Sequence, residues 1–188
     1  MLGKEQKRIY LNISEGKIRK QTEKGVQMFD YVVGDLERIY SRDREFQGEK
    51  VPYWYLDLRD GDTGDLYSLG ISARSGAWRS LILALGSEDF NPLLPVKIST
   101  YKSGQYDRVC VYSGDQRLSW VSDLPPVEEI EAQGRKIKSV AKREEFISGL
   151  VQNINSRITG EDIERPTPTR RRSEAGKQLS LSALMEDS

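Results

Sequence analysis

The sequence predicts a mainly β domain of the α+β class, in which five strands are interrupted by one helix. Three observations support this prediction. Apolar and polar residues alternate with a period of two in residues 51–59, 96–102 and 108–112, as they do in half-buried strands. Clusters of Gly, Asp, Ser and Pro separate these stretches in the way that turns do. Between residues 75 and 86 the apolar period becomes that of an amphipathic helix.

Residues 1–28 predict an N-terminal hairpin and a connector. Residues 9–13 alternate, Ser14 to Lys17 can turn, and Ile18 begins a second short strand. The polar stretch 21–27 is expected to connect this hairpin to the main domain.

Residues 29–122 are expected to form the main domain, which begins with three strands. Residues 29–46 read as one long strand that bends at Gly34, because a curved sheet favours glycine at the bend. The strands 51–59 and 66–71 follow, separated by a loop of turn residues.

A helix then divides the strands. Ser75 is a suitable N-cap, the apolar spacing from Trp78 to Leu85 is helical, and Gly86 stands where a helix ends. A strand at 96–101 and a hairpin at 107–121 complete the domain. Three strands, a helix and two strands are the arrangement of an OB-fold, a five-stranded Greek-key barrel.

Residues 123–158 predict a C-terminal helical segment. A short helical turn is expected at 127–132, and apolar residues from Ile137 to Ile158 recur with the spacing of an amphipathic helix that packs against the barrel. In residues 159–188 the apolar content falls, which predicts a disordered tail.

Composition narrows the function classes. The 188 residues carry 29 Lys and Arg against 29 Asp and Glu, so the net charge is zero and any nucleic-acid site has to be a local patch. Histidine is absent, which excludes triads with a His base and leaves few zinc ligands. We therefore expect a protein that is not an enzyme and needs no cofactor. The lone Cys110 and the lack of a long apolar run favour a cytoplasmic protein with no membrane segment.

Aromatic and basic side chains share the outward face of the predicted strands. Single-stranded nucleic acids bind such a face because bases stack on the rings and phosphates meet Lys and Arg. The tyrosines expected to stack bases are Tyr53, Tyr55, Tyr101 and Tyr112. The cations expected to contact phosphates are Arg59, Lys97, Lys102, Arg108 and Arg117, with Arg74 and Arg79 beside the helix start. Tyrosine is also favoured in strands for its packing alone, so the pattern leaves both interpretations open.

Two other groups of residues have structural interpretations. Trp54, Trp78 and Trp120 fall on apolar faces and are expected in the core. The acids between Asp57 and Asp65 suggest a divalent metal and a hydrolytic enzyme, but their spacing does not match a calcium loop. A hairpin loop rich in Asp and Gly is the interpretation that we favour, with no metal bound.

The layout resembles single-stranded DNA-binding proteins of the OB-fold kind, in particular the small ones encoded by DNA bacteriophages. The resemblance covers residues 29–121 and rests on the strand order and the aromatic and basic strands, with an acidic-tipped tail as a second shared feature. It implies a protein that binds single-stranded DNA in replication or recombination, in the host cytoplasm if the protein is viral. The tail ends Met-Glu-Asp-Ser, without the aspartates and terminal aromatic residue by which bacterial proteins of this kind recruit partners.

The resemblance also implies partners. Replication or recombination proteins would bind the tail, and a homo-oligomer and a preference for RNA are both left open. The alternative function is a β-barrel structural or adaptor protein, in which the outward tyrosines make protein contacts.

Overall fold

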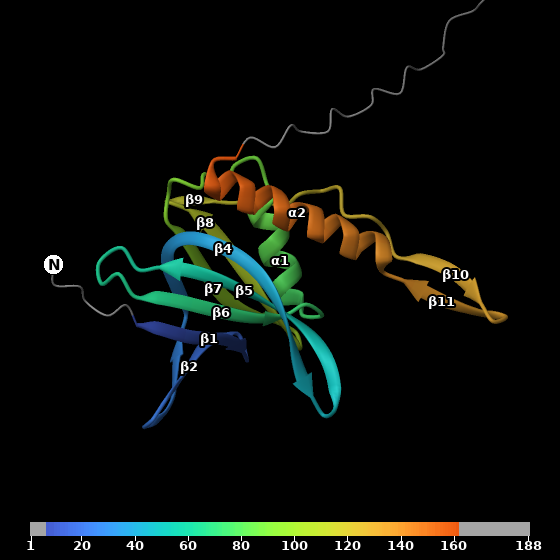
Figure 1. Ribbon diagram of the computed structural model, residues 1–188, viewed down its shortest axis with the longest axis horizontal. Coiled ribbons are helices and arrows are strands. Elements are labelled where there is room, and N and C mark those ends of the chain that lie inside the picture. The colour runs from blue at the N-terminus through green and yellow to red at the C-terminus, as the bar shows by residue number, and fades with distance from the viewer. Residues whose placement is uncertain (1–6, 162–188) are drawn as a thin grey trace, which may run out of the picture.

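The computed structural model describes residues 7–161 and confirms the mainly β class within them. Nine strands form one sheet in the order β3-β2-β1-β6-β5-β4-β7-β8-β9, and a two-stranded hairpin stands apart from it (Figure 1). The strands of the sheet are β1 (Arg8–Ser14), β2 (Lys17–Thr22), β3 (Gly25–Phe29), β4 (Tyr31–Phe46), β5 (Glu49–Arg59), β6 (Leu66–Ser72), β7 (Val96–Ser103), β8 (Tyr106–Ser113) and β9 (Gln116–Arg117). The remaining elements are α1 (Gly76–Leu85), β10 (Glu128–Ala132), β11 (Arg135–Ser139) and α2 (Ala141–Thr159).

The long strand β4 bends at Gly34, as the sequence predicts. Residues 31–34 pair with β7, and from Asp35 onward the strand pairs with β5. A Cβ atom at Gly34 would lie 2.8 Å from the carbonyl oxygen of Arg59, so only glycine allows the two strands to approach this closely. The bend therefore turns one strand into the link between two halves of the sheet.

The five-stranded barrel is not what the described residues form, because the sheet has nine strands and is not closed. The predicted strands keep the order β6-β5-β4-β7-β8, so closure would need β6 to pair with β8. Instead β6 pairs in parallel with β1, from Arg8 opposite Leu66 to Asn12 opposite Gly70. The predicted connector at 21–27 also differs, since it contains the end of β2 and most of β3.

The turn between β1 and β2 contacts the hairpin of β7 and β8, which lies at the other side of the curved sheet. The backbone N–H of Gly16 donates a hydrogen bond to Oδ1 of Asp107 over 2.6 Å. Gly16 has a φ of +73°, and a Cβ there would lie 3.0 Å from the backbone nitrogen of Lys102. The N-terminal hairpin thus lies between β6 and β8, where a closed barrel would have these two strands paired directly with each other.

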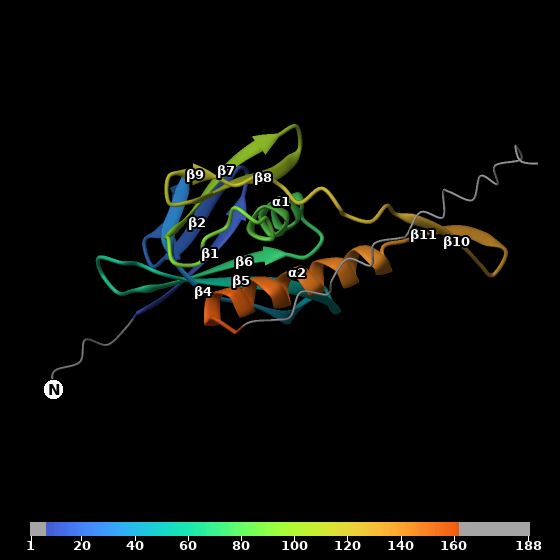
Figure 2. The ribbon, with the colours of Figure 1, turned by 90° about the horizontal axis from the view of Figure 1, so that it is seen from above.

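Helix α1 fills the interior of the curved sheet, between β8 and β6 (Figure 2). It begins where predicted, because the Ser75 hydroxyl accepts a hydrogen bond from the Trp78 backbone N–H over 3.1 Å. Trp78 is buried and stacks on Trp54 with ring centroids 4.8 Å apart. The prediction for Trp120 is wrong: its side chain is 52% exposed, because β9 ends at Arg117 and the alternation stops before residue 120.

Helix α2 confirms the predicted C-terminal helix from Ala141 onward and covers an open stretch of β4. The prediction is wrong at its start, because Ile137 pairs with Ile130 and belongs to strand β11. Val151 and Ile154 are buried on its inner face. The Asn155 side chain accepts a hydrogen bond from the Ile39 N–H and donates one to the Ile39 carbonyl, each over 2.8 Å. Ile39 lies where β4 has lost β7 as its neighbour, so the amide satisfies a strand edge that would otherwise stay unpaired.

The helical turn predicted at 127–132 is wrong, because these residues belong to the hairpin β10–β11. Gln133 and Gly134 both have positive φ values, 53° and 72°, which suits a two-residue hairpin turn. Ile130 pairs with Ile137, and acidic residues of β10 face basic residues of β11. Figures 1 and 2 show this hairpin projecting away from the sheet.

The C-terminal tail and the membrane-spanning potential of the helices are the last features that the sequence predicts. The predicted tail at 159–188 lies outside the described residues, except for 159–161 at the end of α2. Within residues 7–161, neither helix has the length and apolar content that crossing a membrane requires.

Substituting alanine for Gly34, at the bend of β4, and for Gly149, on α2, should change the stability of the protein in opposite directions. Gly34→Ala should lower the free energy of unfolding by about 1–3 kcal/mol, because the added methyl group collides with backbone atoms. Gly149→Ala, on the exposed side of α2 with open space around it, should raise the free energy of unfolding by about 0.5–1 kcal/mol. Urea unfolding measures both, and an unchanged Gly34→Ala protein would show that β4 does not need this bend.

Candidate nucleic-acid interface

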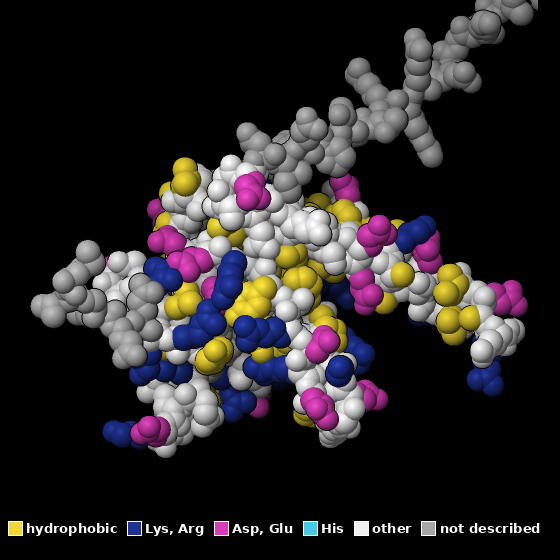
Figure 3. All heavy atoms as spheres, in the orientation of Figure 1, with side chains coloured by type: hydrophobic (Ala, Val, Ile, Leu, Met, Phe, Trp, Pro, Cys, Tyr) yellow, Lys and Arg dark blue, Asp and Glu magenta, His cyan; other side chains and the backbone are white. Residues whose placement is uncertain are grey.

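The outward side chains of β4 and β5 form a continuous surface of arginines and tyrosines. The register places Arg38 opposite Asp57, Tyr40 opposite Tyr55, and Arg42 opposite Tyr53. We call this surface the Arg–Tyr face, and its members are Arg38, Tyr40, Arg42, Arg44, Tyr53 and Tyr55. Figure 3 shows Lys and Arg side chains gathered with apolar ones over β4, β5 and β6.

The rings and the guanidinium groups of this face are stacked on one another. Tyr40 and Tyr55 lie with ring centroids 5.4 Å apart and planes 17° apart. The Cζ atom of Arg38 lies 4.5 Å from the centroid of Tyr40, and that of Arg44 lies 4.7 Å from the centroid of Tyr53. Arg42 adds a third such contact, 5.3 Å from Tyr40. Cation–π attraction therefore holds the arginines over the tyrosine rings.

Asp57 lies beneath this surface and is fully buried. Its Oδ2 atom accepts hydrogen bonds from Nη2 of Arg8 over 2.9 Å and from Nε of Arg38 over 2.7 Å. Its Oδ1 atom accepts one from the Ser68 hydroxyl over 2.5 Å. The two ion pairs neutralise the carboxylate and orient Arg38 toward Tyr40.

Tyr55 faces outward as predicted but is not an open stacking platform, because its side chain is only 6% exposed. Gly70 on the neighbouring strand lets the ring lie flat on the sheet: a Cβ at Gly70 would come within 2.9 Å of Cε1 of Tyr55. Tyr40 covers the ring from the other side, and Arg44 lies 5.4 Å from it. Tyr55 therefore supports the arginines, while Tyr53 remains half-buried at the edge.

A second group of the predicted residues lies on β7, β8 and β9, and we call it the Lys97 group: Lys97, Tyr101, Lys102, Arg108, Tyr112 and Arg117. The ammonium of Lys97 lies 4.6 Å from the ring of Tyr31 and 5.6 Å from the ring of Tyr112. Arg117 is opposite Tyr112 in the register, and Tyr101 is opposite Arg108. Tyr101 and Lys102 are exposed near the end of β7. This group is separated from the Arg–Tyr face by the bend in β4.

Three predicted cations lie apart from both groups. Arg59 forms a two-pronged ion pair with Glu37 and donates to the Gly64 carbonyl over 2.9 Å. The hydrogen bonds that Arg59 donates to the Glu37 carboxylate raise the pKa of Arg59, whose charge is thus already neutralised by a protein partner. Arg74 and Arg79 are exposed at the start of α1.

The residues that sequence reasoning missed are those of β4. Arg38, Tyr40, Arg42 and Arg44 alternate with a period of two inside the predicted strand 29–46, so the signal was present in the sequence. Arg8 and Ser68 carried no such signal. Their contact with Asp57 depends on the pairing of β1 with β6, across 49 positions of sequence for Arg8.

The acids between Asp57 and Asp65 do not gather around a common point. In residues 7–161 no three His, Cys, Asp or Glu side chains are placed to hold a metal ion. Oδ1 of Asp60 instead accepts hydrogen bonds from the backbone N–H groups of Asp62 and Thr63, each over 2.9 Å. These bonds lower the pKa of Asp60, and they form the Asp-rich turn that the sequence predicts.

Comparisons of the chain with family models, with curated proteins and with solved structures find no match.

The buried carboxylate predicts a loss of stability in Asp57→Asn. Asparagine keeps the shape but leaves Arg8 and Arg38 without their anion, and both arginines are partly exposed, so the loss should be about 1–3 kcal/mol. Urea unfolding measures it, with the exposed Asp43→Asn as the control that should change little. Equal stability of the two variants would contradict the role given to Asp57.

The turn at Asp60 predicts a pH-dependent contribution to stability. Because folding lowers the pKa of Asp60 below its ordinary value of 3.8, the ionised carboxylate stabilises the folded protein above that value. The contribution is lost as the pH falls through the lowered pKa. Wild type should therefore melt higher than Asp60→Asn at neutral pH, and the gap should close in strong acid. Asp62→Asn, which removes a neighbouring exposed charge, should show no such closing gap in thermal melts.

Proposed function

We propose that this protein binds single-stranded DNA through the Arg–Tyr face and acts in replication or recombination without being an enzyme. The observation that carries the proposal is the stacking of Arg38, Arg42 and Arg44 on tyrosine rings at 4.5, 5.3 and 4.7 Å. Both guanidinium planes and aromatic rings stack on unpaired bases, and the guanidinium N–H groups also bind phosphates.

The charge of the face supports an anionic partner. The chain as a whole is neutral, but three arginines lie on this face, Arg38, Arg42 and Arg44, and the nearby carboxylate of Asp57 is buried and already paired with Arg8 and Arg38. Their outer surfaces therefore present positive charge to the solvent. Each phosphate that they neutralise releases counterions, so the affinity should fall as the salt concentration rises.

The strand order also supports the proposal. We propose that β4 to β8 with α1 form an OB-fold whose sheet is extended by β1, β2 and β3. OB-folds bind oligonucleotides on the face of their second and third strands, which here are β5 and β6. Tyr53 and Asp57 lie on the outward side of β5, and Gly70 lies on that of β6. The Lys97 group would then extend the path of the strand beyond the bend.

A second candidate function is a structural or adaptor protein. It is favoured by exposed apolar side chains on β3 and the start of β4: Val26, Met28, Phe29, Tyr31 and Val33. Strand β3 is also one of the two edge strands of the sheet. Assembly in size-exclusion chromatography with light scattering, without any binding of oligonucleotides, would favour this candidate.

The proposed function predicts salt-dependent binding of labelled oligothymidine, measured by fluorescence anisotropy. Arg42→Gln should weaken binding by about 1–2 kcal/mol, because a charged hydrogen bond is lost. It should also reduce the slope of log affinity against log salt by about 0.7.

Arg135→Gln is the matched control, since Arg135 is exposed on the projecting hairpin β10–β11 and should leave both quantities unchanged. Absence of binding at low salt, or equal effects of the two substitutions, would contradict the proposal. A matched oligouridine tests whether RNA is bound equally well.

A further inference from the structure

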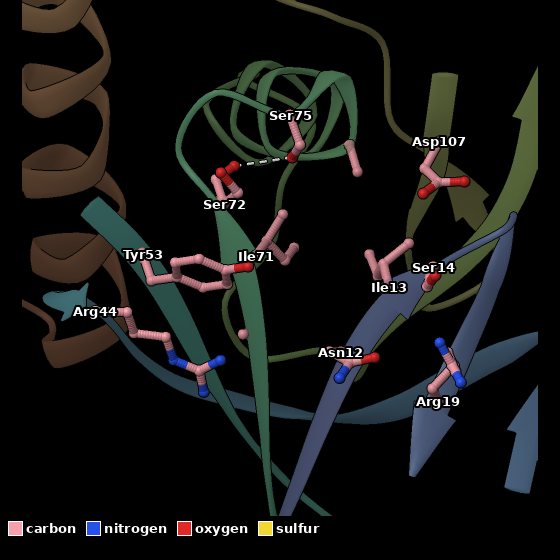
Figure 4. Close-up of a pocket in the computed structure, with 12 residues that line it drawn as sticks. Asn12, Ile13, Ser14, Arg19, Arg44, Tyr53, Ile71, Ser72, Ser75 and Asp107 are labelled. Carbon is pink, nitrogen blue, oxygen red and sulfur yellow. Dashed lines mark hydrogen bonds between the residues drawn. The ribbon is translucent and has the colours of Figure 1, made fainter. Parts of the chain in front are cut away.

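A cavity of about 260 Å³ adjoins one end of the Arg–Tyr face. It opens because β1 and β6 run in parallel and then separate: after Ser14 the chain turns into β2, and after Ser72 it turns toward α1. Figure 4 shows Arg44 and Tyr53 on one side of the cavity, Arg19 and Asp107 on the other, and Asn12 between them. Small-molecule pockets usually measure about 300–1,000 Å³, so this one suits a group no larger than a single nucleobase.

The cavity wall combines cations with hydrogen-bonding groups. The guanidinium of Arg44 is held over the ring of Tyr53, 4.7 Å from its centroid. Asp107 is positioned by the Gly16 N–H, which donates to its Oδ1 atom. Asn12 and Arg19 make no side-chain hydrogen bond or ion pair with another residue in the described part of the chain. Their polar atoms are therefore available to a ligand.

We infer that this cavity accepts one nucleotide of the bound strand and prefers a base that carries an exocyclic amine. The inference rests on the proposed function, since Arg44 and Tyr53 belong both to the cavity and to the Arg–Tyr face. The base stacks beside Tyr53, its amine donates to the Asp107 carboxylate, and Asn12 contacts the same base edge. Arg19 and Arg44 bind the flanking phosphates from opposite sides.

The chemistry of Asp107 selects among bases. A carboxylate accepts hydrogen bonds but donates none, so it pairs with the N4 amine of cytosine. Thymine presents a carbonyl oxygen at that position, and two acceptors facing each other repel. The cavity should therefore favour oligocytidine over oligothymidine, and because both are pyrimidines their stacking differs little.

Fluorescence anisotropy at neutral pH with labelled oligodeoxycytidine and oligothymidine of equal length tests the inference. Wild type should bind the cytidine oligomer about fivefold or more tightly. Asp107→Asn keeps an oxygen acceptor for Gly16 but adds an amide donor, so the preference should disappear while the affinity for oligothymidine stays within about twofold. Asp115→Asn, an exposed substitution outside the cavity, should keep the preference.

Arg19→Gln, on β2, is a second variant, and it tests the inference even if the Asp107→Asn protein fails to fold. It should weaken both oligomers equally and reduce the salt slope by about 0.7. Binding without a base preference, or a preference that survives in Asp107→Asn, overturns the inference and leaves the proposed function intact. An unchanged salt slope in Arg19→Gln also overturns it. Failure of wild type to bind either oligomer overturns both proposals.

Discussion

The carboxylate of Asp57 is buried inside the sheet, and a buried charge persists only where it is paired and hydrogen-bonded. Its partners come from three other strands: Arg8 on β1, Arg38 on β4 and Ser68 on β6. Neutralisation of Asp57 therefore requires β1, β6, β5 and β4 to lie side by side in the observed register. The same ion pairs orient Arg38 over Tyr40, so the arrangement of the outer face depends on the same buried group.

Ion pairs of this kind add little net stability, because removing charges from water costs nearly as much as their attraction returns. Their consequence here is geometric. Arginine side chains lose considerable rotamer freedom when a ligand orders them. Arginines already held by Asp57 or by a tyrosine ring lose less, which favours binding of a stacked, anionic partner. The buried ring of Tyr55 also reduces this loss of rotamer freedom, since it contacts Tyr40 and Arg44 and limits their movement before a ligand binds.

The parallel pairing of β1 with β6 has two consequences for the architecture. It occupies the edge of β6 and so prevents β6 from pairing with β8, which keeps the sheet open. It also places the ends of β1 and β6 side by side. Beyond these ends the chain turns into β2 on one side and toward α1 on the other, and the cavity lined by Asn12, Ser72 and Asp107 lies between the two. The N-terminal hairpin is thus part of the central sheet and of the cavity wall.

Local patterns in the sequence were sufficient for the elements whose signals are short in range. The Ser75 cap and the spacing around Trp78 predicted α1, the apolar stripe predicted α2, and Gly34 marked the bend. The alternation of Arg38, Tyr40, Arg42 and Arg44 is a signal of the same short range. Such features follow from the period of the backbone, which the sequence carries by itself.

Only the tertiary structure decided which outward residues are accessible and which strands are neighbours. The period of two places Tyr53 and Tyr55 on one face, but Gly70 from another strand determines that Tyr55 is covered. The partners of Asp57, the exposure of Trp120 and the parallel β1–β6 pair depend likewise on contacts between distant segments. A strand pattern specifies the two faces of a strand, whereas burial and pairing depend on the residues that the rest of the chain brings against it.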